Sequence, residues 1–259
     1  METKKQINTN IKFFDDNIKL LKEGDLVMIT SYCPIWNTQL FINLALEIAK
    51  TTEVMFLSCK YEMETIEKYF AKTIHNRKLY GESLPFENID LQRANLELYK
   101  LKFKLEASKY FNYHKIWNET IGEICGEDKN LKVLFIDQID YLYLKKDWDL
   151  EKNLKKLAKY AKVENICIVI NCAIPALKKL KIKKLYEMNF LKRMNIQHAY
   201  FDKIIALHKD EYFGINEDVS GKSTHGMLEF NILFSRDESE NHYYGYVGTN
   251  WKIDFDKFN

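Results

Sequence analysis

Short apolar runs alternate with amphipathic segments along the first two thirds of the chain. The apolar runs predict buried strands, and the segments between them carry apolar residues about one helical turn apart, which predicts helices. The strands are expected at 27–29, 54–57, 103–105, 133–137 and 166–170, and the helices at 40–49, 61–72, 89–101, 116–125 and 150–161, with a loop at 75–85. Strands that alternate with helices favour a mainly parallel sheet that is covered on both faces.

The last third of the chain follows a different pattern. Apolar runs at 204–207, 228–234 and 243–247 succeed one another without an amphipathic helix, and glycines at 214, 221 and 226 mark turns between them. Such runs predict a meander of antiparallel strands. We therefore predict the α/β fold class, with a mainly parallel central sheet flanked by helices and an antiparallel C-terminal extension.

Length and composition fit a single domain. A chain of 259 residues with 46% hydrophobic residues supplies one large core. We assign residues 13–259 to this domain and expect the polar residues 1–12 to form a frayed leader or a docking arm. The five cysteines, Cys33, Cys59, Cys125, Cys167 and Cys172, lack zinc-binding spacing and indicate reduced thiols.

Charge and hydropathy narrow the setting in which the protein works. The net charge is only +2 despite 39 basic residues, so binding to nucleic acid requires locally clustered lysines. No apolar run reaches the length of a membrane-spanning helix, and the first residues lack the apolar segment of a secretory signal. We expect a soluble cytoplasmic protein without a membrane partner.

The stretch 24–49 predicts a buried strand, a tight loop and a helix. This arrangement aims loop amides and a helix N-terminus at phosphate groups, so it is where a phosphate-binding P-loop would lie. The loop at 30–38, however, contains neither glycine nor lysine.

Several short stretches around this loop occur in a recognisable order. They are Gly24-Asp25-Leu26, Asn43-Leu44-Ala45-Leu46, Phe135-Ile136-Asp137 followed by Tyr141-Leu142, Lys209-Asp210-Glu211-Tyr212-Phe213, and Trp251 to Phe255. In their order and spacing, the chain from about Phe13 to Phe255 resembles the RecA-like C-terminal motor domain of DnaB-type replicative helicases. The resemblance implies a RecA-like P-loop NTPase fold.

The resemblance also assigns roles around the loop. The family's loop ends Gly-Lys-Thr, and the lysine holds the β- and γ-phosphates. Trp36 takes the glycine position, Asn37 takes the lysine position and Thr38 keeps the hydroxyl. An indole fills space that phosphates need and Asn37 brings no charge, so we expect a degenerate Walker A loop. We expect no cofactor, or residual ATP bound at Asn37 and Thr38, with Mg²⁺ at Thr38 and Asp137.

Other catalytic positions of the family are partly kept. Asp137 matches the aspartate that organises Mg²⁺, although a carboxylate that caps the next turn reads the same way in sequence. Cys59 stands where the family has a glutamate that activates water. Cys172, beside Asn171, stands where the family has a glutamine sensor.

Near the end of the chain, the family carries a lysine and an arginine that reach the neighbouring subunit's nucleotide. Phe234 replaces the lysine, and Arg236 retains the arginine. Arg236 equally fits a surface salt bridge. Asp137 and Arg236 are therefore the two vestigial catalytic candidates.

A lysine run follows Pro175. Lys178, Lys179, Lys181, Lys183 and Lys184 lie where the family has a DNA-binding loop, and lysines there would contact phosphates. The alternative is a solvated helix face with the intervening leucines turned inward. A second basic patch comprises Lys145, Lys146, Lys152, Lys155 and Lys156.

Together these features predict a degenerate DnaB-like motor domain, impaired or inactive as an ATPase. It would act in DNA replication or recombination as a DNA-binding or helicase-associated subunit. Its expected partners are single-stranded DNA and replication or helicase-associated proteins, and the family's rings imply an oligomer. Two alternatives stay open: an active ATP-dependent DNA helicase or translocase whose missing charge comes from Lys60 or a neighbouring subunit, and a non-catalytic protein-interaction module.

Overall fold

A computed structural model describes residues 4–31, 34–78, 96–107, 130–143, 150–173, 197–218, 220–237, 241–247 and 253–254. Its strands are β1 (Leu26–Ser31), β2 (Val54–Ser58), β3 (Phe103–Ala107), β4 (Val133–Asp137), β5 (Cys167–Ala173), β6 (Lys203–His208), β7 (Met227–Ser235), β8 (Asn241–Val247) and β9 (Ile253–Asp254). Its helices are η1 (Phe14–Ile18), α1 (Pro34–Ile48), α2 (Met63–Lys78), α6 (Asp140–Tyr143), α7 (Leu150–Glu164), η5 (His198–Tyr200) and η6 (Asp210–Phe213).

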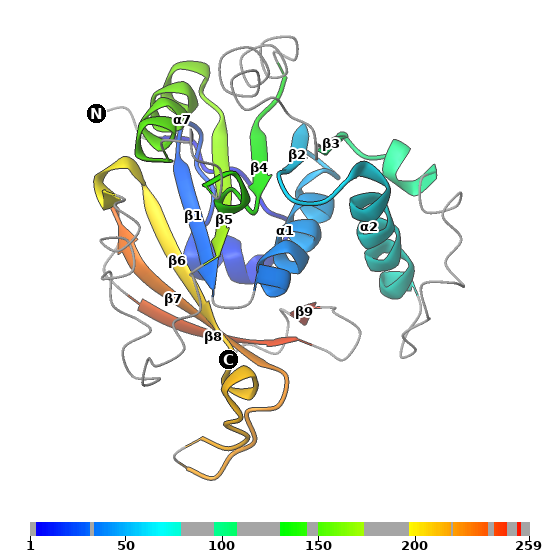
Figure 1. The fold of residues 1–259 in the computed structure, drawn as a ribbon, viewed down its shortest axis with the longest axis vertical. Coiled ribbons are helices and arrows are strands. Elements are labelled where there is room, and N and C mark those ends of the chain that lie inside the picture. Colours follow the sequence, from blue (N-terminus) through cyan, green and yellow to red (C-terminus); the bar gives the residue numbers. More distant parts are fainter. Residues whose placement is uncertain are drawn as a thin grey trace.

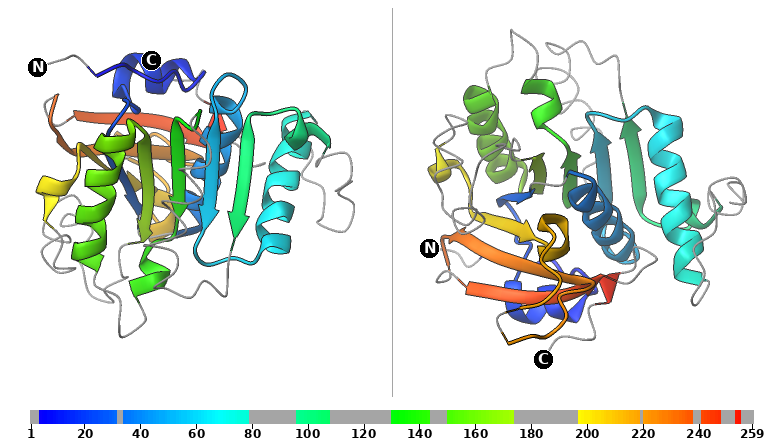
Figure 2. Two further views of the ribbon diagram at one scale, coloured as in Figure 1. Left: turned by 90° about the horizontal axis from the view of Figure 1, so that it is seen from above. Right: turned by 60° about the horizontal axis from the view of Figure 1, so that its bottom comes forward.

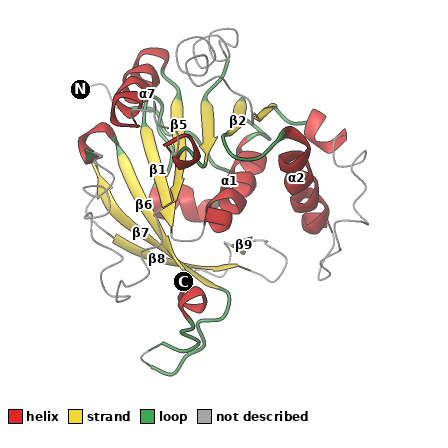
Figure 3. Cartoon of the chain, viewed as in Figure 1, coloured by secondary structure: helices red, strands yellow, loops and turns green. Residues whose placement is uncertain are grey.

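One nine-stranded sheet, in the order β3-β2-β4-β5-β1-β6-β7-β8-β9, runs through the molecule (Figure 1). Strands β1 to β6 are mutually parallel, and β7, β8 and β9 add antiparallel pairs at one side. Figure 3 shows the helices gathered around the parallel part and the meander extending from it. The predicted α/β fold class and its antiparallel extension are confirmed.

Helices lie on both sides of the sheet (Figure 2), and its two faces bury two separate sets of side chains. Because neighbouring residues of a strand point to opposite faces, Val133 and Phe135 of β4 lie in the core under α1 and α2, whereas Leu134 and Ile136 lie in the core under α7. All five residues of β4 are buried. Burial on both faces explains why the parallel strands read as continuous apolar runs.

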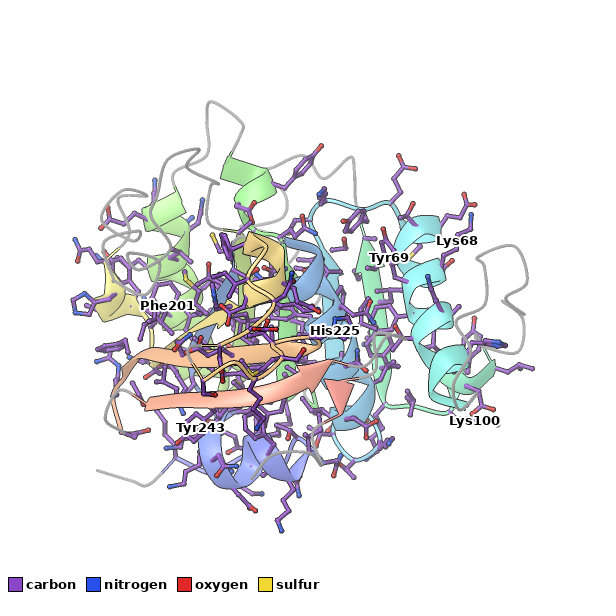
Figure 4. All side chains as sticks on the ribbon, turned by 90° about the horizontal axis from the view of Figure 1, so that it is seen from below. Lys68, Tyr69, Lys100, Phe201, His225 and Tyr243 are labelled. Carbon is purple, nitrogen blue, oxygen red and sulfur yellow. The ribbon has the colours of Figure 1, made fainter. Side chains whose placement is uncertain are left out.

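Residues 4–12 pack against the body, so the expectation of a frayed leader was wrong for them. Ile7 and Ile11 are buried in the core, and the backbone of Ile7 donates to Leu21 at 3.0 Å. Phe13 then meets Tyr243 of β8 edge to face at 6.0 Å between ring centroids, and Figure 4 shows Tyr243 beside this segment. Alternating apolar residues within a polar stretch supplied the surface for this packing. The division into 1–12 and a 13–259 domain stays a prediction.

The helix boundaries depart from the sequence pattern in three places. Helix α1 begins at Pro34 instead of residue 40, because a proline is well accommodated in the first turn of a helix. Helix α2 continues to Lys78 and takes up the start of the loop expected at 75–85, and α7 continues to Glu164. The predicted helix at 116–125 and most of that at 89–101 lie outside the described residues.

All six parallel strands end at the same edge of the sheet, which we call the carboxyl edge. The start of α1, the end of β4 and the end of β5 meet there. In an open parallel sheet this edge is where ligands bind. No helix in the described ranges is long and apolar enough to cross a membrane.

Candidate functional site

The site is centred on the first turns of α1, where Asn37 and Thr38 are 0% and 4% exposed. Both residues lie inside the helix, since α1 starts at Pro34. Trp36 also belongs to α1, but its side chain lies outside the described part of the structure. The side chains at positions 37 and 38 therefore define the site.

Thr38 and Asp137 are in direct contact. The Thr38 hydroxyl lies 3.0 Å from each carboxylate oxygen of Asp137, and it accepts a hydrogen bond of 2.9 Å from Nε2 of Gln138. The structure thus brings together the two residues predicted to hold Mg²⁺. Here they satisfy each other's hydrogen-bonding capacity.

Asn37 joins the same network through Asn171 of β5. Its Nδ2 donates to Oδ1 of Asn171 at 2.7 Å, and Nδ2 of Asn171 donates in turn to Oδ1 of Asp137. Oδ1 of Asn37 is buried and has no hydrogen-bond partner. The residue at the lysine position is therefore turned toward β5, and its remaining polar atom is an acceptor.

Burial dominates the electrostatics of Asp137. The carboxylate is 0% exposed, and burial raises its pKa from 3.8 to about 7, although the hydrogen bonds from Asn171 and Thr38 act in the opposite direction. The nearby charge of Asp140 raises this pKa further, and the ammonium of Lys60 lowers it. Asp137 therefore titrates near neutral pH.

Cys59 and Cys172 flank Asp137 without the chemistry of the residues they replace. Both thiols are buried and free, and burial raises the pKa of each well above its usual value. The backbone N–H of Cys59 donates to the carbonyl oxygen of Asp137 at 3.0 Å. A buried neutral thiol is a poor general base, so Cys59 does not supply the function of a glutamate.

Arg236 lies at the opposite edge of the sheet, where β1 and β6 begin. Its Nε is 3.2 Å from Oδ1 of Asp202, and its guanidinium also donates to the carbonyl oxygen of Ala199. Phe234 packs edge to face on His198 at 5.2 Å between ring centroids. The guanidinium is thus engaged within its own chain, in line with the salt-bridge alternative.

The predicted DNA-binding lysines, Lys178, Lys179, Lys181, Lys183 and Lys184, lie outside the described residues, as do Lys145 and Lys146. The other three lysines of the second patch, Lys152, Lys155 and Lys156, are exposed on α7. These three lysines are accessible to a binding partner. The DNA-binding role of the lysine run at 178–184 stays a prediction.

The sequence analysis missed Gln138 and Asp140. Gln138 is 2% exposed and has a left-handed backbone with φ 55°, a conformation that non-glycine residues seldom adopt outside special sites. Asp140 accepts a 2.9 Å hydrogen bond from the backbone of Ala173. Their places directly after Asp137 were the only sequence signal, since a positive φ cannot be read from residue types.

The residues present fit a metal ion better than a triphosphate. A hydroxyl and a carboxylate at Thr38 and Asp137 are oxygen ligands of the kind Mg²⁺ takes. Phosphate oxygens, however, need donors or cations, and Asn37 offers an unsatisfied acceptor in place of an ammonium. Within the described ranges, no cluster of three or more His, Cys, Asp or Glu side chains forms a metal site.

Comparisons with solved structures place this geometry in a known fold. The chain superposes on a solved ATPase domain of a DnaB-like helicase with a TM-score of 0.72 and 12% identity, covering 95% of this chain and 90% of that one. For a DnaB-like replicative helicase, solved in a study of its interactions with primase, the TM-score is 0.75 with 15% identity, covering 98% of this chain and 64% of that one.

A third similar structure, the RadB recombinase, has a TM-score of 0.56 and 14% identity, covering 95% of this chain and 98% of that one. No family model and no curated protein sequence matches the chain. The present chain corresponds to just under two thirds of the length of the replicative helicase. On these superpositions, the chain has the RecA-like fold that is found in the ATPase domains of DnaB-like replicative helicases.

Proposed function

We propose that this protein is a helicase-related RecA-like domain that has lost efficient ATP hydrolysis and acts in DNA replication or recombination as a DNA-binding or helicase-associated subunit. The RecA-like fold of the helicase and recombinase structures supports the setting. ATP and Mg²⁺ are then at most weakly bound ligands, and an assembly with further copies or with replication proteins is the form in which it works.

One observation carries the proposal: the P-loop positions are turned inward. Asn37 is hydrogen-bonded to Asn171 and Thr38 to Asp137, and all four side chains are buried. Phosphoryl transfer depends on positioning and charge stabilisation around the phosphates. The loop lacks the lysine that would stabilise the phosphate charge, and Cys59 stands at the strand end in place of a base that would position the attacking water. The site therefore supplies neither positioning nor charge stabilisation.

Phosphate release in the presence of single-stranded DNA tests the proposal. We expect turnover at the level of an Asp137→Ala control. DNA-stimulated turnover of about 1–100 per second, the range typical of kinases, that disappears in Asp137→Ala would overturn it.

A second candidate is an active ATPase with a divergent loop. It is favoured by the intact contact between Thr38 and Asp137 and by Lys60, whose charge acts on both Asp137 and Asp140. In that case Lys60 replaces the missing lysine. Lys60→Met should then abolish DNA-stimulated turnover, while Lys50→Met, a change of an exposed lysine at the end of α1, should not.

A further inference from the structure

The outer face of α7 carries a stripe of lysines. Lys152, Lys155, Lys156, Lys159 and Lys162 are all exposed, and they recur every three or four residues, so they lie on one side of the helix. The opposite side, formed by Leu154, Leu157, Ala158 and Ala161, is buried against the sheet. The stripe therefore faces away from the body of the molecule, as the position of α7 on the outside of the sheet indicates (Figure 2).

Helix α7 carries a net positive charge. Residues 150–164 contain five lysines and two glutamates, a formal charge of +3, whereas the whole chain carries +2. The remainder of the chain is slightly negative. A local excess of lysines on one exposed helix face is the pattern expected of an anion-binding face.

Three other lysines of the described residues are each paired with a glutamate three or four residues before them. Lys50 pairs with Glu47 in this way, Lys68 with Glu64, and Lys100 with Glu97. The stripe on α7 is built differently. Lysines precede Lys159 and Lys162 at these spacings, so like charges face each other, which destabilises a helix.

Three lysines of the stripe have no carboxylate partner among the described residues: Lys155, Lys159 and Lys162. For Lys155 the glutamate four residues before it, Glu151, instead accepts a hydrogen bond of 3.0 Å from the hydroxyl of Tyr200. These ammonium groups are therefore available to an external polyanion.

We propose that the lysine face of α7 binds the phosphate backbone of a single-stranded nucleic acid. Lysine is a flexible point charge that suits phosphates without fixing a sequence. The exposed residues of α7 include one apolar side chain, Val163, which is too little apolar surface for a membrane-inserting helix. They include no aromatic ring, so bases are not stacked here and recognition is independent of sequence.

The inference rests on the DNA-binding part of the proposed function and adds a second surface to it. It concerns other residues than the lysine run at 178–184, and the two sets of lysines are tested in parallel. The probe is a fluorescein-labelled oligothymidylate, and the measurement is fluorescence anisotropy over a series of salt concentrations.

The test variant is Lys155→Glu with Lys159→Glu and Lys162→Glu. The matched control reverses three other exposed lysines, Lys5, Lys12 and Lys222, for the same change in net charge. Each contact with a single strand contributes a slope of about −0.7 to the logarithm of affinity against the logarithm of salt. We expect the test variant to bind about tenfold or more weakly at low salt with a slope reduced by about 2, and the control to retain the wild-type slope.

Each other outcome contradicts the inference in a recognisable way. Wild-type affinity in the α7 variant, with binding lost in Lys178→Glu with Lys181→Glu and Lys184→Glu, leaves DNA binding in place and removes α7 from it. If the wild type shows no salt-dependent binding, both the inference for α7 and the DNA-binding part of the proposed function are contradicted. Equal displacement by a polyglutamate peptide of matched charge indicates an acidic protein surface instead. Circular dichroism and a triple glutamine variant separate loss of binding from loss of folding.

Discussion

The two edges of the parallel sheet handle buried carboxylates in opposite ways. At the carboxyl edge, Asp137 is held by the neutral groups of Thr38 and Asn171, and no ion pair to it is found in the described part of the chain. At the edge where β1 and β6 begin, Lys4 pairs with both Asp25 and Asp202, and Arg236 pairs with Asp202. We call this second edge the amino edge.

The difference shows how buried carboxylates behave with and without an ion pair. A buried carboxylate without an ion pair takes up a proton near neutral pH, whereas a paired one is stabilised by the opposite charge. The pKa of Asp137 is about 7. The pKa of Asp25 is also raised by burial, but Lys4 acts against the shift. Among the described residues, ion pairs thus hold the carboxylates of the amino edge, whereas neutral hydrogen-bonding groups hold Asp137 at the carboxyl edge.

The largest expected effect is a pH dependence of stability that comes from Asp137. Its carboxyl titrates near 3.8 in the unfolded chain and near 7 in the folded one. Between these values the folded state holds a proton that the unfolded state has released. The stabilisation of the folded state by the protonated Asp137 carboxyl is therefore complete below about pH 4, and it is lost as the pH rises through 7.

Relative to Asp137→Asn, the wild type should lose on the order of 3 kcal/mol in free energy of unfolding between pH 4.5 and 7.5. Urea unfolding of both proteins at four pH values measures this. Parallel pH profiles of the two proteins would show that Asp137 is not the titrating group.

Thr38→Val should have the next largest effect. Valine keeps the volume but leaves Nε2 of Gln138 without an acceptor and removes one of the donors to Asp137, so we expect a loss of about 2 kcal/mol. Thr65→Val, a half-buried position on α2, is the control and should change stability by less than about 0.5 kcal/mol. Equal losses in both variants would contradict a special role of the network.

At the amino edge, Lys4→Ala should cost about 1 kcal/mol. The ammonium is 38% exposed, so solvent screens its pairs with Asp25 and Asp202, and the loss should shrink when salt is raised. The neighbouring Lys5→Ala, at an exposed position, should be neutral. A loss that is independent of salt would mean that packing of residues 4–12, and not charge, is what Lys4 supports.

The smallest effect is expected at the rim of the same edge. Lys22 lies 2.6 Å from Asp237, whose side chain is 55% exposed, and such pairs contribute about 0.5 kcal/mol or less. Thermal unfolding of Lys22→Ala should therefore lie close to wild type. A loss as large as that of Lys4→Ala would show that the two ion pairs form one cooperative unit.

Much of the fold was predictable because β1, β2, β4, β5 and β6 are buried along their whole length and mostly read as apolar runs. The start of α1 was not, since residues 34–39 show little apolar periodicity, and Asn37 and Thr38 are held by their contacts with Asn171 and Asp137. The burial of residues 4–12 depends on Ile7 and Ile11 meeting a surface formed by distant segments. Such tertiary effects override a polar local pattern.

In the candidate site, the resemblance led to Thr38 and Asp137, and the structure puts them in contact. It did not lead to Gln138, whose role depends on a left-handed backbone conformation. Nor did it give the direction of Asn37, which depends on Asn171, a residue 134 positions away in the chain. The sequence shows which hydrogen-bonding groups are present. The partners and directions of these hydrogen bonds depend on how α1 and the strand ends come together at the carboxyl edge.

The affinity of the protein for Mg²⁺·ATP tests most directly whether the carboxyl edge has lost its phosphate site. It is measured by titration with a fluorescent ATP analogue, for the wild type and for Trp36→Gly with Asn37→Lys, which restores the family's loop residues. We predict no saturable binding by the wild type up to about 1 mM and at least tenfold tighter binding by the double variant. Micromolar, Mg²⁺-dependent binding by the wild type that is lost in Asp137→Ala would contradict the account.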